Sequence, residues 1–178
     1  MHAALDLFTE HGYDATTVAQ IAERAGLTKT TFFRHFPDKR EVLFAGQDTY
    51  ARLLADAIAA APDSATPLEA IAVALDTVTA TFTPAQREFE PRLQAVISRN
   101  SELRERAAFK RAGLATAMTA ALHRRGVPDL TASLAAGLGV RVFDCAFARW
   151  VDPANEQTFT ELARQALHEL RVANASLD

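Results

Sequence analysis

Cationic and hydroxyl side chains are concentrated in one short stretch of this 178-residue chain. From Thr28 to Arg40 the sequence has four Lys or Arg residues and one Asp, a net charge of +3 (four minus one), whereas the whole chain carries −3. Threonines at positions 17, 28, 30 and 31 add short hydrogen-bond donors. Such groups bind phosphate oxygens and the edges of bases. The stretch therefore predicts a local polyanion-binding surface on a slightly acidic protein.

Residue patterns typical of catalysis or metal binding are missing from the sequence. The histidines at 11, 123 and 168 are isolated, and there is no His-Glu-x-x-His pair, paired Glu-x-x-His helices or glycine-rich phosphate loop. The single cysteine, Cys145, cannot form an internal disulfide and lies in a helical pattern without a placed base. We therefore expect no enzyme, no metal and no cofactor. A reducing, cytoplasmic location fits this cysteine usage, and no apolar stretch approaches the roughly 20 residues of a membrane span.

The positive stretch lies in a pattern of two short helices joined by a tight turn. Thr17 with Gln20 has the capping-box spacing that begins a helix, and Gly26 can take the left-handed conformation that ends it. Thr28 can cap the second helix, which Pro37 ends. With an amphipathic helix over residues 1–11, this pattern predicts a helix-turn-helix unit whose second helix can enter a DNA major groove.

The rest of the chain has helical periodicity and no alternating apolar pattern typical of strands. Asp38 with Glu41 is expected to begin a long fourth helix that runs to about residue 61. The predicted fold is all-α with about nine helices, divided into a helix-turn-helix domain over 1–45 and a second helical domain over 46–178. The later helices are expected at about 68–82, 84–98, 101–125, 129–151 and 155–173.

Ala3–Leu43 has the sequence AALDLFTEHGYDATTVAQIAERAGLTKTTFFRHFPDKREVL. It contains, in this order, an apolar first helix with Phe, a Gly, Thr-Thr, an Ile-Ala helix that ends in Ala-Gly, and the motif aromatic-x-His-Phe-Pro-x-Lys. This segment closely resembles the DNA-binding domain of TetR-family transcriptional regulators. The resemblance implies that the bases are faced by Lys29, Thr30 and Phe33. It implies that phosphates are contacted by Thr17, Arg34, His35 and Lys39. Thr28 is added to this set because its hydroxyl can donate a hydrogen bond to a phosphate. The family usually has tyrosine where this chain has Phe33, which lacks a hydroxyl for a phosphate.

The resemblance also implies that the second half of the chain binds a small-molecule effector and forms a homodimer. Large side chains at helical spacing are the expected pocket lining, unless they are ordinary core: Phe82, Phe89, Phe109, Met118, Leu122, Phe143, Phe147 and Trp150. Two C-terminal apolar stripes are the expected dimer interface, unless they too are monomer core: Leu134, Leu138, Phe159, Leu162, Ala166, Leu167 and Leu170. The basic residues at 92, 99, 106, 110 and 111 are expected to form a solvated face with partners such as Glu102 and Glu105, the alternative being that they bind an anionic ligand headgroup.

The resulting expectation is a cytoplasmic, homodimeric repressor that a small apolar or acyl-type ligand releases from its operator. Its expected partners are a double-stranded DNA operator with (pseudo)palindromic half-sites, the unidentified effector and a second copy of the chain, and no membrane. Two alternatives stay open: an activator of the same family, and a helical adaptor that binds protein and no DNA.

Overall fold

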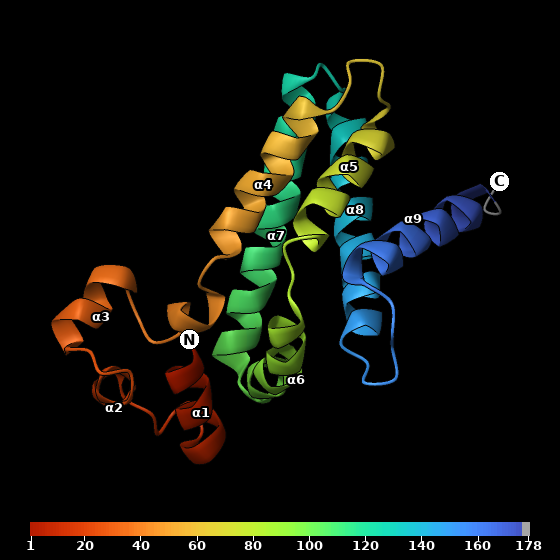
Figure 1. Ribbon diagram of the computed structural model, residues 1–178. Coiled ribbons are helices and arrows are strands. Elements are labelled where there is room, and N and C mark those ends of the chain that lie inside the picture. Colours follow the sequence, from red (N-terminus) through yellow and green to blue (C-terminus); the bar gives the residue numbers. More distant parts are fainter. Residues whose placement is uncertain (176–178) are drawn as a thin grey trace. The chain divides into compact units, whose positions relative to one another are not determined.

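A computed structural model describes residues 1–175, and all regular structure in this range is helical (Figure 1). The prediction of an all-α fold with about nine helices is confirmed for the described residues. The helices are α1 (His2–His11), α2 (Val18–Arg24), α3 (Lys29–His35), the short 3₁₀ helix η1 (Glu41–Phe44), α4 (Gln47–Ala60), α5 (Pro67–Thr79), α6 (Pro84–Arg99), α7 (Ser101–Arg124), α8 (Asp129–Trp150) and α9 (Phe159–Ala175).

The α2–turn–α3 segment forms from the local signals that the sequence contains. The Gln20 amide donates to Thr17 Oγ1 at 3.3 Å, and the Thr17 amide donates to Gln20 Oε1 at 2.8 Å, so both halves of the capping box are made. Gly26 has a φ of +68°, which an L side chain rarely adopts. Thr28 Oγ1 accepts a hydrogen bond from the Thr31 amide at 3.1 Å and so caps α3.

The expected long fourth helix is interrupted, so that prediction was wrong in one respect. Asp38 Oδ1 accepts hydrogen bonds from the amides of Arg40 at 2.8 Å and Glu41 at 3.2 Å, as a cap would, but the helix it begins is η1. Gly46 then has a φ of +90°, outside the range of a right-handed helix. A separate helix, α4, starts at Gln47 and continues to Ala60.

The chain divides into two compact units, and α6 and α7 each contribute to both. Unit 1 comprises residues 1–47 and 89–110, and unit 2 comprises residues 48–88 and the chain from 111 onward. Segment 89–110, which the sequence assigned to the second domain, therefore packs with the N-terminal helices. The apolar core of unit 1 joins buried residues of α1, α2 and α3, such as Leu5, Ile21 and Phe32, to Leu93 of α6 and Leu103 of α7.

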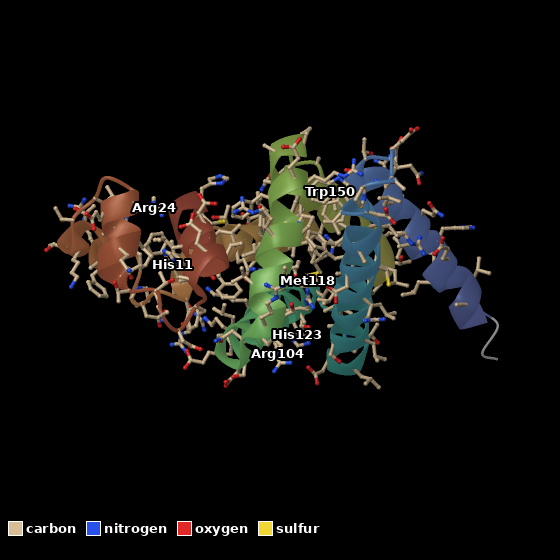
Figure 2. All side chains as sticks on the ribbon, turned by 90° about the horizontal axis from the view of Figure 1, so that it is seen from below. His11, Arg24, Arg104, Met118, His123 and Trp150 are labelled. Atoms are coloured by element: carbon tan, nitrogen blue, oxygen red, sulfur yellow. The ribbon has the colours of Figure 1, made fainter. Side chains whose placement is uncertain are left out.

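The core of unit 2 is built on α5, α8 and α9. Gly139 on α8 allows the two backbones to approach, because a Cβ built there would lie 2.8 Å from Cγ2 of Ile71 on α5. Met118 of α7 also reaches this point, since its Sδ would lie 3.5 Å from the same Cβ (Figure 2). At the far end of α8, the ring of Trp150 stacks on Phe159 with centroids 5.1 Å apart.

One described helix, α8, is long and apolar enough to cross a membrane by length and composition alone. The expectation that no apolar stretch approaches a membrane span needs this correction. One face of α8, which includes Ala132, Ala136 and Ala146, is buried in the core of unit 2. Another part of its surface carries Arg141 and Asp144. The composition of α8 therefore reflects close packing of small residues in unit 2.

Candidate nucleic-acid interface

The outer face of α3 presents the residues that the sequence predicts to face DNA bases. Lys29, Thr30 and Phe33 are all exposed, and so is Arg34 beside them. On the opposite side Phe32 is buried, with 2% of its surface accessible, and its ring meets that of Phe36 at 5.3 Å. The aromatic pair anchors the helix in the core of unit 1, which leaves the polar face free to contact a ligand.

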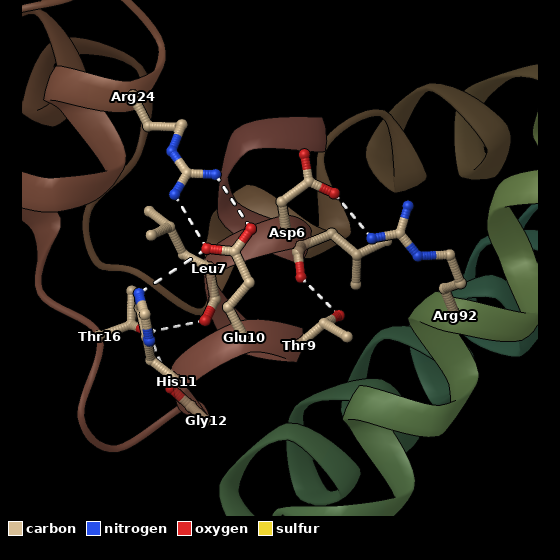
Figure 3. A network of polar contacts seen from close by, with 10 residues as sticks. Asp6, Leu7, Thr9, Glu10, His11, Gly12, Thr16, Arg24 and Arg92 are labelled. Carbon is tan, nitrogen blue, oxygen red and sulfur yellow. Dashed lines mark hydrogen bonds and ion pairs between the residues drawn. The ribbon is translucent and has the colours of Figure 1, made fainter.

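Charge in unit 1 is unevenly neutralised, and α3 is one of the places where cations have no acidic partner among the described residues. Arg24 makes a two-point ion pair with Glu10 at 3.1 and 2.9 Å, and Arg92 pairs with Asp6 at 2.7 Å (Figure 3). Within residues 1–175, in contrast, neither Lys29 nor Arg34 has an ion-pair partner. The exposed face of α3 therefore presents two positive charges to solvent that no nearby carboxylate neutralises.

Three of the predicted phosphate contacts already have hydrogen bonds within the protein. Lys39 Nζ donates to the carbonyl oxygens of Tyr13 at 2.7 Å and Thr16 at 3.1 Å, and it lies 4.1 Å from the centroid of the Tyr13 ring. This ammonium ties the α1–α2 loop to the segment after α3, a role that the sequence did not indicate. Thr17 and Thr28 serve as helix caps but stay exposed, as does His35. The phosphate contacts of all four remain predictions.

A second set of polar residues, which sequence reasoning missed, joins the N-terminal helices to segment 89–110. The Tyr13 hydroxyl donates to Glu102 Oε2 at 3.3 Å, and burial raises the pKa of Tyr13, so the phenol stays protonated as a donor. Asn100 Nδ2 donates to Asp14 Oδ1 at 3.4 Å. With the Asp6–Arg92 pair, these contacts attach α6 and α7 to the α1–α2 region.

Glu41 forms the largest of these junctions. Its carboxylate is only 13% exposed and contacts Arg106 through one oxygen and Lys110 through the other, the latter at 3.5 Å. Two of the basic residues expected on a solvated face thus pair with Glu41, a partner that the sequence did not indicate. The partners lie 65 or more residues apart in sequence, so no local spacing could have indicated the contact.

The eight predicted pocket residues are divided between the two units, six in unit 2 and two in unit 1. In unit 2, Phe82 contacts Phe143 and Trp150, at 6.0 and 5.6 Å between centroids, and Phe147 contacts Trp150 at 6.0 Å. Met118 and Leu122 are fully buried in the same core. The other two belong to unit 1: Phe89 packs edge-on against His2 at 4.7 Å, and Phe109 is 65% exposed with Arg106 5.0 Å above its ring. A pocket that joins all eight residues stays a prediction.

Among the described residues, Oδ1 of Asp144 is the one buried side-chain nitrogen or oxygen atom that makes no hydrogen bond. Arg111 Nε lies 3.1 Å from this oxygen in an ion pair. The distance is short, but the alignment does not meet hydrogen-bond geometry. Burial raises the pKa of this carboxyl, and the nearby guanidinium groups of Arg111 and Arg141 oppose that rise.

The predicted dimer residues on α9 are mostly core of the chain itself. Leu162 is 2% exposed and Leu167 is 6% exposed, and Phe159 and Ala166 are buried as well. They pack within unit 2, so they are not available to a second chain, and that part of the prediction was wrong. On α8, by contrast, Leu134 is 58% exposed and Leu130 is 71% exposed. Leu138 and Leu170 are partly buried.

No group of three or more His, Cys, Asp or Glu residues is placed to hold a metal ion in the part of the chain that the structure describes.

Comparison with known proteins places the N-terminal helices in one family. Residues 1–45 match the family described as bacterial regulatory proteins, tetR family. The chain is 39% identical over 75 residues to the HTH-type transcriptional regulator TcmR of Streptomyces glaucescens, which covers 42% of this chain and 33% of TcmR. It is 42% identical over 45 residues to the regulator RutR of Escherichia coli K12, or 25% of this chain and 21% of RutR. The chain thus matches a third or less of these relatives' length.

A solved structure extends the likeness to the whole fold. Thermus thermophilus FadR, a TetR-family transcriptional repressor in complex with lauroyl-CoA, superposes with a TM-score of 0.52 and 22% identity over 95% of this chain and 90% of that one. The fold is therefore shared over nearly the full length. Residues 1–45 thus match the DNA-binding domain of the TetR family of bacterial transcriptional regulators, and the chain is similar in fold to a solved member of that family.

Proposed function

We propose that this chain is a homodimeric transcriptional regulator that binds operator DNA with α3 in the major groove. The observation that carries the proposal is the exposed face of α3, where Lys29 and Arg34 have no ion-pair partner among the described residues while Arg24 and Arg92 of the same unit are paired. Cations that are already exposed and unpaired can bind phosphates or guanine without first breaking an internal contact.

The proposed roles of the α3 residues, base contact or phosphate contact, follow from where each residue lies along the helix. Lys29 and Thr30 lie in its first turn, and the residues that start a recognition helix are those that reach base edges. Arg34 lies near its end and is proposed to hold a phosphate. Phosphate contacts fix the register of the protein on the duplex, and base contacts determine the sequence that it prefers.

The experiment is selection of duplexes from a random-sequence pool by the full-length protein, followed by salt titration of the selected duplex. Lys29→Ala should relax the preference at one base pair of each half-site, at a cost of about 1–3 kcal/mol per site. Arg34→Ala should weaken all duplexes alike and reduce the salt slope by about one unit for each phosphate that Arg34 neutralises. Arg164→Ala is the matched control, because it removes one positive charge from α9, where Arg164 pairs with Asp76 at 2.9 Å. A protein that selects no duplex would contradict the proposal and leave the adaptor alternative.

Two copies are needed to bind two half-sites, and α8 offers the surface for pairing. Leu130 and Leu134 lie one turn apart on α8 and are exposed, so we propose that this face, with Leu138, meets its symmetry mate. A dimer would place two recognition helices on a (pseudo)palindromic operator. Light scattering of the purified protein measures whether it is a monomer or a dimer.

We further propose that the protein is a cytoplasmic repressor. A small apolar or acyl-type ligand is proposed to bind unit 2 and release the protein from its operator. Support comes from the partly exposed rings of Phe82, Phe143 and Phe147 and from the fold shared with FadR, whose structure contains lauroyl-CoA. Linkage requires that a ligand that weakens DNA binding is itself bound more weakly by the DNA complex, by the same factor. A panel of apolar and acyl-thioester compounds, screened for stabilisation of the protein and for operator release, tests this. Activation by the same ligand would favour the activator alternative.

A further inference from the structure

Phe33 is the feature of the α3 surface that a purely electrostatic interface does not explain. It is 53% exposed, although the neighbouring Phe32 is buried with 2% of its surface accessible. A single exposed aromatic residue is common on protein surfaces and carries little information alone. Here it lies on the polar face of α3, four residues after Lys29 and three after Thr30, so the three side chains are neighbours on the helix surface.

The ring of Phe33 is held in place from below. Phe33 and Phe32 meet edge to face, with centroids 5.6 Å apart and an angle of 86° between the planes. Phe32 is itself fixed by the unit 1 core. Such a contact favours one orientation of the exposed ring and reduces the entropy lost when the ring is buried by a ligand.

The chemistry of the ring restricts what it can contact in a major groove. A phenyl group has no donor or acceptor, so it cannot bind a phosphate or the polar edge of a base. The thymine 5-methyl group is the apolar feature that the major groove presents, and phenylalanine is among the side chains that contact it. Lys29, Thr30 and Arg34 around the ring supply the polar contacts that would hold the helix in the groove.

We propose that Phe33 reads a thymine 5-methyl group in each half-site of the operator, an inference that rests on the proposed DNA-binding function. Phe33 is then a specificity-determining residue. A tyrosine at this residue could instead contact a phosphate through its hydroxyl, whereas the phenyl ring of Phe33 favours thymine in the operator.

The test uses the duplex that the full-length protein selects from a random-sequence pool. Each thymine is replaced in turn by deoxyuridine, which removes only the methyl group and keeps the base pair. At one thymine per half-site the wild-type protein should lose about fourfold in affinity, which corresponds to about 0.8 kcal/mol for one buried methyl group. Phe33→Ala should bind the thymine and deoxyuridine duplexes equally well, because the ring that senses the methyl group is gone.

Three variants control for weaker binding as such. Phe33→Leu keeps an apolar side chain and should retain part of the methyl effect. Lys29→Ala should lower affinity but keep the fourfold ratio at the same thymine. Leu27→Ala removes another exposed apolar side chain, 45% accessible and outside α3, and should also keep the ratio.

The outcomes separate the inference from the function on which it rests. If the protein selects a duplex but no thymine shows a methyl effect that Phe33→Ala abolishes, the inference is overturned and the DNA-binding proposal stands. If no duplex is selected, both are overturned.

Discussion

Replacing Gly139 with alanine should destabilise unit 2, although the same change in an exposed helix is stabilising. Alanine is favoured over glycine in a helix interior by about 1 kcal/mol. Against this gain, the added Cβ would lie 2.8 Å from Ile71 Cγ2, whereas carbon atoms in contact prefer about 3.5–4.0 Å. Ile71 is fully buried and branched at Cβ, so this methyl group cannot swing aside without a change of rotamer. Overpacking of this kind costs about 1–3 kcal/mol, and the net loss should be about 1 kcal/mol.

The matched control is Gly137→Ala, two residues earlier on the same helix. A Cβ at Gly137 has no atom within 4 Å, so this variant should gain about 0.5–1 kcal/mol from helix propensity alone. The only tryptophan, Trp150, is buried in unit 2, so its fluorescence follows the unfolding of this unit in urea. A shift of the midpoint at constant slope measures the change in stability.

A third variant tests the cause of the effect. Ile71→Leu removes the Cγ2 branch while it keeps the side-chain volume, so it should cost less in the Gly139→Ala background than in the wild type. If Gly139→Ala is as stable as Gly137→Ala, or if Ile71→Leu has the same effect in both backgrounds, the close contact between α5 and α8 does not limit this packing and the reasoning is refuted.

Three further predictions concern polar and interface residues. Glu41→Gln should lower the stability of unit 1 by about 2 kcal/mol, because it removes the negative charge that Arg106 and Lys110 share at a partly buried site; amide exchange in residues 101–110 should accelerate while the Trp150 midpoint stays unchanged. Asp144→Asn should stabilise unit 2 at pH 7 and leave its stability unchanged at pH 3. Burial raises the pKa of Asp144 in the folded protein, so this carboxyl contributes its full stability only at a pH below the ordinary pKa of Asp. The contribution is lost as the pH rises through the raised pKa of the folded state. A difference between the variant and the wild type that does not depend on pH would contradict this. Leu134→Glu should yield a folded monomer by light scattering, whereas Leu167→Glu should unfold unit 2, as read by fluorescence; an unchanged dimer in Leu134→Glu would place the interface elsewhere.

Local signals were sufficient to predict the candidate site. The capping box at Thr17, the left-handed Gly26 and the cap at Thr28 each depend on residues at most a few positions apart, so their geometry follows from the sequence itself. The same holds for the buried Phe32 and the exposed Phe33, which differ by about 100° around the helix. These signals also indicated the family whose DNA-binding domain matches residues 1–45.

By itself, then, the sequence determined most of the helices, though not the break between η1 and α4, and it determined the turn before α3 and which α3 residues face outward. Only the tertiary structure decided which apolar stripes are core, because Leu167 and Leu134 have the same hydrophobicity and differ only in what packs over them. It also decided that Lys39 is held by two backbone carbonyls and that Glu41 pairs with Arg106, 65 residues away. Partners this distant meet only through the packing of whole helices, and the spacing of residues along one helix contains no information about that packing.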